Sequence, residues 1–442
     1  MSSSQHAGGL LRLITCGSVD DGKSTLIGRL LHDSKAIHDD QLEAVRKTTA
    51  ARGGIGGAGS ASGAGQEVDL ALLTDGLRAE REQGITIDVA YRYFATPVRK
   101  FILADTPGHV QYTRNMVTGA STADVAVILI DARQGVVEQT RRHACIAVLL
   151  GVSHLIVCVN KMDLVDYSQA RFEEIRDDFE RFASTARPDG DTPVANRAQV
   201  RFFPISALKG DNVVERTDVM PWYTGPALLE FLEAVPDRDS RHSGSARFPV
   251  QYVIRPQSKD HHDYRGYAGQ MAAGAFRIGD EVEVRPSGYR SRITRIHVGE
   301  EQLTECFAPQ SVAIELADDI DISRGEMIVR ADDVQPPREA REITATVVWM
   351  APQPLVPGKR VTVQFAAKTV AAVVKEIAQR LDIQTLEQHD QVTQLGLNEI
   401  GRVVIKLAAP VAADGYAQCR GTGCCIIIDD QTNNTVGAGM IH

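Results

Sequence analysis

The sequence predicts an α/β domain with a mostly parallel sheet and helices on both faces, followed by two β-barrel domains. Between Leu10 and about Val235, apolar strand-like runs alternate with helical patterns, which is typical of a parallel sheet wrapped by helices. After Phe248, short alternating strands are separated by Gly and Asp turns, which is typical of β-barrels. Polar stretches at 237–247 and 331–339 separate these regions. We therefore predict domains at 1–238, 246–335 and 340–442.

Length, charge and cysteine content narrow the class of protein. A chain of 442 residues is too long for a single core. Its 57 acidic and 48 basic residues give a formal net charge of -9, which argues against non-specific binding to nucleic acid. Without a basic and apolar leader or an apolar run of about 18 residues, we expect a cytoplasmic chain that binds no membrane. Seven cysteines with no C-x-x-C pair predict buried thiols.

The strongest motif is a phosphate-binding loop (P-loop) between a strand-like run and a helical run. It reads Gly17, Ser18, Val19, Asp20, Asp21, Gly22, Lys23, Ser24 and Thr25. The two glycines let backbone N–H groups surround a β-phosphate. Lys23 would then bridge the β- and γ-phosphates, and the Ser24 hydroxyl would bind Mg²⁺.

The next stretch contains a candidate switch residue, Thr86. We expect a helix over 40–49, a Gly-rich surface loop over 52–66 and a polar, helix-prone stretch over 75–83. Thr86 alone would be an ordinary β-branched strand residue. Because it lies between the P-loop and the next motif, we predict instead that its hydroxyl completes the Mg²⁺ shell as part of switch I, a segment ordered by the γ-phosphate.

A second switch motif ends the strand-like run 100–104. It reads Asp105, Thr106, Pro107, Gly108 and His109. Asp105 can reach Mg²⁺ through water, and the Gly108 N–H can sense a γ-phosphate. His109 could be a surface histidine, but its position directly after Gly108 favours a water-orienting role.

Two further motifs predict guanine specificity. Asn160, Lys161, Met162 and Asp163 follow the apolar run 155–159, and Ser206, Ala207 and Leu208 follow the run 201–205. The Asp163 carboxylate can accept both N1–H and N2–H of guanine, a donor pair that adenine lacks. The tripeptide is weak alone, but its order after the other motifs predicts a backbone N–H donated to guanine O6. The P-loop, the Asp105 motif and the two guanine motifs each follow a strand-like run, so they should meet at the carboxyl edge of the sheet.

Together these motifs resemble those of translational-type GTPases. Residues 17–25, 75–94 and 105–121 more specifically resemble the GTPase subunit of bacterial sulfate adenylyltransferase. That resemblance implies a P-loop GTPase domain with two barrels, GTP and Mg²⁺ as cofactors, and catalytic roles for Lys23, Thr86 and His109. It also implies that this chain hydrolyses GTP while a smaller partner, in a heterodimer or higher assembly, makes adenosine 5′-phosphosulfate from ATP and sulfate. Val110 departs from the pattern, since many members carry an acidic residue there.

The alternative is a translation-factor-like GTPase that delivers an RNA. Net charge does not separate the two, but Asp20, Asp21 and the block 75–94 favour the sulfate family. Neither a His-x-Gly-His adenylyl-transfer motif nor a second P-loop occurs in the chain. The resemblance therefore assigns adenylyl transfer to the partner.

Three smaller features have simple interpretations. His261, His262 and Asp263 read as a loop and not as a metal site. Cys424 and Cys425 open an apolar strand-like run and should be buried as small side chains. Residues 375–382 show a short helical pattern, which we interpret as a helix covering a barrel end.

Overall fold

The computed structural model describes residues 9–34, 88–108, 113–187, 192–236, 244–256, 264–382, 388–390 and 392–442. Several sequence predictions fall outside these ranges and stay predictions. They are the helix over 40–49, the Gly-rich loop, the helix-prone stretch over 75–83, Thr86, His109, Val110 and the segment 261–263. The chain folds as two compact units, Met1–Asp237 and Arg238–His442.

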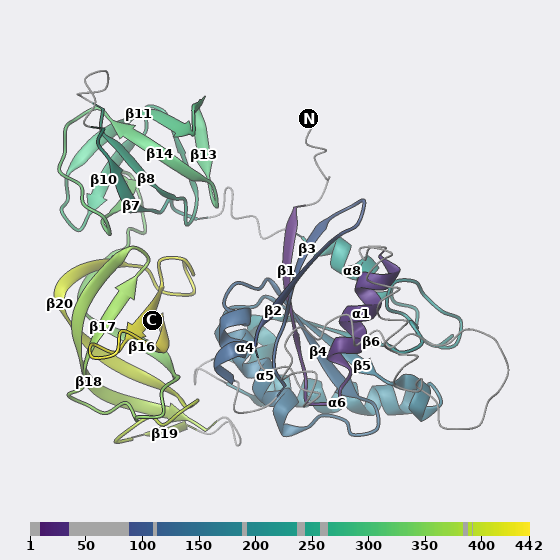
Figure 1. Cartoon of the computed structure of the whole chain (residues 1–442). Helices are drawn as coiled ribbons and strands as arrows, with labels where there is room; N and C mark the ends of the chain where they lie inside the picture. Colours follow the sequence, from purple (N-terminus) through teal and green to yellow (C-terminus); the bar gives the residue numbers. More distant parts are fainter. Residues whose placement is uncertain are drawn as a thin grey trace. The chain divides into compact units, whose positions relative to one another are not determined.

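The first unit is built on a six-stranded sheet with the order β2-β3-β1-β4-β5-β6 (Figure 1). Its strands are β1 (Leu10–Cys16), β2 (Ala90–Ala95), β3 (Lys100–Asp105), β4 (Val125–Asp131), β5 (His154–Asn160) and β6 (Gln199–Pro204). All neighbours are parallel except the edge strand β2, which runs antiparallel to β3. The predicted, mostly parallel sheet is confirmed.

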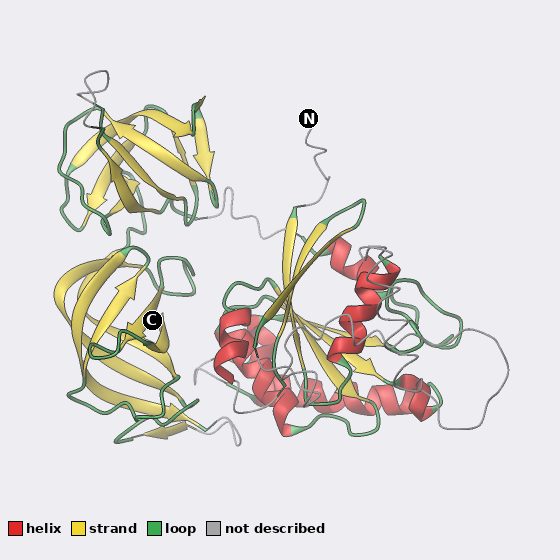
Figure 2. Ribbon diagram, in the orientation of Figure 1, coloured by secondary structure: helices red, strands yellow, loops and turns green. Residues whose placement is uncertain are grey.

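Helices lie on both faces of this sheet (Figure 2). They are α1 (Lys23–Asp33), α4 (Thr113–Ala120), α5 (Glu138–Leu149), the 3-10 helix η3 (Met162–Val165), α6 (Gln169–Thr185), α7 (Val194–Arg197) and α8 (Leu228–Ala234). On one face, α1 and α8 pack their leucines into a core with alternate residues of β1, β3 and β4, such as Leu13, Leu103 and Val127. The wholly buried β4 accounts for the continuous apolar run in the sequence.

The strand order places the sequence motifs at one edge of the sheet. The P-loop follows β1, and Thr15 near the end of β1 is in register with Asp105 at the end of β3. At the same edge, Asp131 at the end of β4 is in register with Asn160 at the end of β5. The candidate site therefore lies at the carboxyl ends of the parallel strands.

The second unit contains two closed β-barrels. The first has the strand order β10-β15-β7-β8-β14-β11 and closes through pairing of β10 with β11. Its strands are β7 (Phe248–Ile254), β8 (Gly266–Gln270), β10 (Glu281–Arg285), β11 (Arg290–Val298), β14 (Ser311–Leu316) and β15 (Met327–Arg330), with β12 (Glu301–Leu303) beside β11 and a separate pair of β9 (Ala275–Arg277) and β13 (Glu305–Phe307). Its core includes Phe248, Tyr267 and Phe276.

The second barrel has the order β17-β21-β22-β16-β20-β18 and closes through pairing of β17 with β18. Its strands are β16 (Arg338–Trp349), β17 (Arg360–Phe365), β18 (Lys368–Leu381), β20 (Ile400–Ala413), β21 (Cys424–Ile428) and β22 (Thr435–Ile441), with β19 (Gln388–Asp390) beside β18. Trp349 is fully buried in its core. The predicted fold class is confirmed, while the limits of the three domains stay a prediction.

The helix predicted over 375–382 is wrong. Residues 375–381 belong to β18, which pairs with β20 and, near its end, with β19. Register shifts between Val374 and Glu376 and between Ile377 and Gln379 interrupt the strict alternation of buried residues. Val374, Ile377 and Leu381 are therefore buried at spacings of three and four, which imitate a helical period.

Two other sequence predictions concern thiols and membranes. All seven cysteines are free thiols, and all are buried except Cys424, which is half-buried. Burial raises the pKa of Cys16, Cys145 and Cys425 to about 12, so these thiols are inert. Among the residues that the structure describes, no helix is long and apolar enough to cross a membrane.

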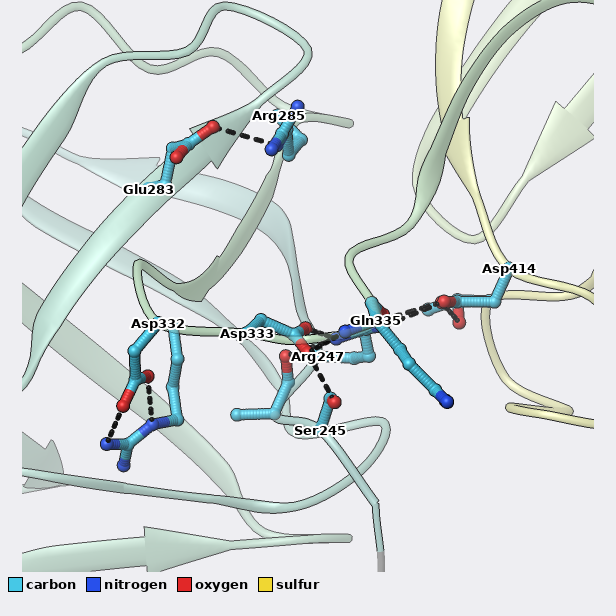
Figure 3. A network of polar contacts seen from close by, with 11 residues as sticks. Ser245, Arg247, Glu283, Arg285, Asp332, Asp333, Gln335 and Asp414 are labelled. Carbon is cyan, nitrogen blue, oxygen red and sulfur yellow. Dashed lines mark hydrogen bonds and ion pairs between the residues drawn. The ribbon is translucent and has the colours of Figure 1, made fainter.

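A buried ionic network in the second unit joins the segments before β7, between β15 and β16, and after β20 (Figure 3). Arg247, which precedes β7, donates from Nε to Asp414 at 2.9 Å and from Nη1 to Asp333 at 2.5 Å. All three side chains are at most 4% exposed. Ser245 donates to Asp333, and Thr422 donates to Asp414. One guanidinium thus neutralises carboxylates from segments far apart in the sequence.

Candidate nucleotide-binding site

The P-loop turns directly from β1 into α1. Gly22 caps α1 with φ +93°, and a Cβ at this position would lie 2.5 Å from Nδ2 of Asn160. Only glycine suits both this backbone and this close approach. The first residue of α1 is Lys23, whose Nζ donates to the carbonyls of Gly17 at 3.1 Å and Ser18 at 2.7 Å. Burial lowers the pKa of Lys23, and the nearby carboxylates of Asp105 and Asp21 oppose this shift.

The other residues of the P-loop differ in how deeply they are buried. Asp20 is exposed with φ +67°, while Ser18, Val19, Ser24 and Thr25 are partly buried. Asp21 is 2% exposed, and its carboxylate accepts from the backbone N–H of Ser18. Burial raises the pKa of Asp21, whereas the hydrogen bond from Ser18 and the charge of Lys23 lower it. The buried Asp21 side chain therefore stabilises the conformation of the P-loop.

Asn160 and Lys161 fasten the guanine-specificity loop to the P-loop. Asn160 Nδ2 donates to the carbonyl of Asp21 at 2.8 Å, and Lys161 Nζ donates to the neighbouring carbonyl of Asp20. Lys161 reaches it from a left-handed backbone conformation with φ +62°. The guanine-specificity loop is thus hydrogen-bonded to two consecutive carbonyls of the P-loop.

Asp163 lies beside the Ser206 segment. The Ser206 hydroxyl donates to Oδ1 of Asp163 at 2.7 Å, and Oδ1 of Asn160 accepts from the N–H of Ala207 at 2.9 Å. Met162 is fully buried, and its N–H donates to Ile205 at 3.2 Å. Asp163 and the tripeptide thus lie side by side, where one purine ring can contact both.

The Asp105 motif packs against the opposite side of the P-loop. Thr15 donates to Oδ1 of Asp105 at 3.0 Å, and Thr106 donates to the carbonyl of Thr15 at 2.6 Å. Pro107 and Gly108 are buried. A Cβ at Gly108 would lie 2.7 Å from both the Gly17 carbonyl and Nζ of Lys23. Only a residue without a side chain fits there.

The chemistry of the site fits a nucleoside phosphate with a divalent cation. Lys23 and the N–H groups at the start of α1 can bind phosphate oxygens. The Ser24 hydroxyl and the Asp105 carboxylate are the hard oxygen ligands that Mg²⁺ prefers, with phosphate oxygens and water completing its shell. Thr86 and His109 lie outside the described residues, so their predicted parts in the site stay predictions.

Sequence reasoning missed Asp131, the residue that holds Lys161. Its buried carboxylate accepts from Lys161 Nζ at 3.0 Å and from Nε and Nη2 of Arg133 at 3.0 and 2.6 Å. Burial alone would raise the pKa of Asp131, but the hydrogen bonds from Arg133 and Lys161 lower it well below its usual range. Its position at the end of a strand-like run was the signal that could have identified it.

Arg29, Gln139 and His143 were also missed. Arg29 of α1 donates to the carbonyls of Ala207 at 3.1 Å and of Leu208, and so supports the Ser206 segment. Gln139 of α5 donates to the carbonyl of Gly108 at 2.8 Å and also contacts His143. No sequence motif that we used includes these positions, because Arg29 and Gln139 act through backbone carbonyls of other segments and His143 acts through Gln139.

Known protein families match parts of both units. Residues 9–237 match the sequence model of the elongation factor Tu GTP binding domain, and residues 342–442 match that of the GTP-eEF1A C-terminal domain-like family. The GTPase-like domain of Ski7 from S. cerevisiae, solved with GDP and inorganic phosphate, has a TM-score of 0.50 to this chain at 17% identity, covering 98% of this chain and 97% of that one. At such low identity the likeness concerns the fold alone.

Relatives are similar over nearly the whole chain. The chain is 53% identical, over 98% of its length, to the bifunctional enzyme CysN/CysC of Mycobacterium tuberculosis, of which the match covers 67%. It is 51% identical, again over 98% of its length, to sulfate adenylyltransferase subunit 1 of Cellvibrio japonicus, of which the match covers 86%. The family resemblance predicted from the motifs is confirmed. The chain belongs to the family of sulfate adenylyltransferase subunit 1, and its first unit is a GTP-binding domain of the elongation factor Tu type.

Proposed function

We propose that this chain hydrolyses GTP and couples the hydrolysis to synthesis of adenosine 5′-phosphosulfate from ATP and sulfate by a smaller partner subunit. The observation that carries the proposal is identity above 50% across 98% of the chain to a protein named sulfate adenylyltransferase subunit 1. Four GTPase motifs lie in the described part of the chain, and their meeting at one edge of a parallel sheet supports it. The name subunit 1 implies a second subunit, and the chain has no His-x-Gly-His motif of its own.

In this proposal the P-loop binds the phosphates. The backbone N–H groups of residues 17–25 surround the β-phosphate, and Lys23 turns from the carbonyls of Gly17 and Ser18 to the β- and γ-phosphates. Ser24, Thr86 and Asp105 would hold Mg²⁺ through their oxygen atoms. The cation, when bound, neutralises charge that develops on the phosphate oxygens.

Guanine is selected by Asp163 and the Ser206 segment. The Asp163 carboxylate accepts N1–H and N2–H of the base, while its contact with Ser206 keeps it in place. A backbone N–H of residues 206–208 donates to O6. Adenine would place its N1 acceptor and C2–H opposite the carboxylate and its 6-amino donor opposite the backbone N–H, and it is rejected for that reason.

Hydrolysis depends on positioning the attacking water. We propose that Gly108 N–H contacts the γ-phosphate and that His109 orients the water in line with the bond that breaks. Thr86 should matter only when a γ-phosphate is present. Hydrolysis would then change the conformation of the two switch segments, which the partner subunit would sense.

Co-purification tests the proposal. The chain is expressed with a tag in its native background, and bound proteins and RNA are identified. A smaller nucleotidyltransferase should co-purify, and GTP turnover should rise when ATP and sulfate are added to the pair. Co-purification of a specific RNA without a nucleotidyltransferase would favour the translation-factor alternative and overturn the proposal.

A further inference from the structure

Gln139 of helix α5 contacts Gly108 of the second switch motif (Figure 1 shows α5 beside the sheet). Nε2 of Gln139 donates to the carbonyl of Gly108 at 2.8 Å. Gly108 in turn packs so closely against Gly17 and Lys23 that no Cβ would fit. The contact therefore reaches a backbone segment in the first layer around the phosphate site.

The orientation of the Gln139 amide is determined by its neighbours. Oε1 of Gln139 accepts from Nη1 of Arg142 at 3.2 Å, and Nη2 of Arg142 is paired with Glu138 at 2.7 Å. A guanidinium can only donate and a backbone carbonyl can only accept. The amide oxygen must then face Arg142, and the amide nitrogen must face Gly108.

The same logic determines the tautomer of His143. The second hydrogen of the Gln139 amide nitrogen points to Nε2 of His143, 2.9 Å away. Nε2 must therefore accept, and the ring proton lies on Nδ1. His143 is 3% exposed, and burial lowers its pKa to about 3, with the positive charges of Lys23 and Arg142 adding to this effect. The ring stays neutral, so Nε2 remains an acceptor.

We propose that Gln139 is a positioning residue: with His143 fixing its amide, it holds the Gly108 carbonyl and thereby sets the preference of the site for GTP over GDP. The proposal rests on the assignment of a GTP site made above. Only GTP carries the γ-phosphate that can contact the Gly108 N–H, so an interaction that holds Gly108 affects GTP binding and leaves GDP binding unchanged.

The first test compares nucleotide affinities of the full chain. Gln139→Ala should weaken GTP about tenfold, the scale of one lost hydrogen bond to a positioned group, and change GDP affinity less than about twofold. Gln134→Ala is the matched control, since Gln134 is exposed on the loop before α5 and its substitution should change neither affinity. Equal losses for GTP and GDP, or no loss, would overturn the proposal.

A second pair of variants separates hydrogen bonding from packing. In His143→Gln, the side-chain oxygen can still accept from Gln139, so the ratio of GTP to GDP affinity should stay within about twofold of the wild-type ratio. His143→Leu fills the site without an acceptor and should lower the ratio towards that of Gln139→Ala. Identical ratios in these two variants would show that only packing matters and would contradict the proposal.

The tautomer gives a readout that does not depend on affinity. The ¹⁵N spectrum of the histidine rings, assigned by its difference from His143→Gln, should show a protonated Nδ1 and an unprotonated Nε2 in His143 from pH 5 to 8. A ring that titrates in this range, or carries its proton on Nε2, would exclude the arrangement. Failure of the wild-type chain to bind GTP would instead refute the proposed function, and so the two failures are distinguishable.

Discussion

The side-chain amide of Asn160 donates a 2.8 Å hydrogen bond to the backbone carbonyl of Asp21, a residue 139 positions earlier in the sequence. Both residues are about 2% exposed. Oδ1 of the same side chain accepts from the backbone N–H of Ala207. One side chain therefore connects the loop that would bind phosphate with both loops that would bind the base. Alignment of base and phosphates in the site should depend on it.

We predict that Asn160→Ala weakens GDP and GTP equally, by tenfold or more. The substitution leaves a buried carbonyl and a buried N–H without their partner, and each such loss costs about 1 to 3 kcal/mol. Titration with a fluorescent GDP and a fluorescent GTP measures both affinities. A selective loss of GTP would mean that Asn160 acts through the switches instead of through the loop connection.

Asp163→Asn should exchange guanine specificity for xanthine specificity. Xanthine presents an acceptor where guanine presents its amino group, so the new amide donor fits xanthosine nucleotides. Competition among GTP, ATP and xanthosine triphosphate for the chain measures the change. Unchanged preference for GTP would show that Asp163 does not recognise the base.

Asp131→Asn should destabilise the first unit in a pH-dependent way. The pKa of Asp131 is lower in the folded chain than its ordinary value near 4, so its ionised form stabilises the fold above that pH. The stabilisation is lost as the pH falls through the folded pKa. The variant should therefore be less stable than the wild type by a constant amount from pH 7 to 5, and the difference should narrow below about pH 4.

Urea unfolding followed by the helical circular dichroism signal measures this effect, because all helices in the described parts of the chain lie in the first unit. Asp177→Asn is the control, since Asp177 is 56% exposed and, among the described residues, forms an ion pair only with its neighbour Arg176. Its substitution should change the unfolding free energy by less than about 1 kcal/mol. A difference between Asp131→Asn and wild type that grows as pH falls would contradict the account.

Arg247→Met should destabilise the second unit by about 3 to 5 kcal/mol, because it leaves Asp333 and Asp414 buried without their cation. The chain has two tryptophans, Trp222 and Trp349, and only Trp349 lies in the second unit. Denaturant unfolding in a Trp222→Phe background therefore reports that unit. Arg292→Met removes an exposed pair with Glu281 and should cost less than about 1 kcal/mol. Similar costs for both variants would contradict the importance assigned to the buried network.

The sequence predicted the parts of this protein whose chemistry is local. The P-loop depends on Gly22 and Lys23, which act within a few residues of each other, and the strand-like runs fixed the sheet that carries it. Asp131, Arg29 and Gln139 escaped prediction because each contacts a backbone carbonyl or side chain from a distant segment. The helix predicted over 375–382 failed for a different reason, since two register shifts in β18 gave apolar residues a helical spacing.

The measurement that tests the central claim most directly is the yield of adenosine 5′-phosphosulfate from ATP and sulfate. The chain is assayed alone, with its purified smaller subunit, and with that subunit plus either GTP or a non-hydrolysable GTP analogue. We predict no product from the chain alone, and a yield above the equilibrium of the uncoupled reaction only when the subunit and hydrolysable GTP are both present. Product from the chain alone, or an equal yield with the analogue, would contradict the claim that this chain couples GTP hydrolysis to sulfate activation.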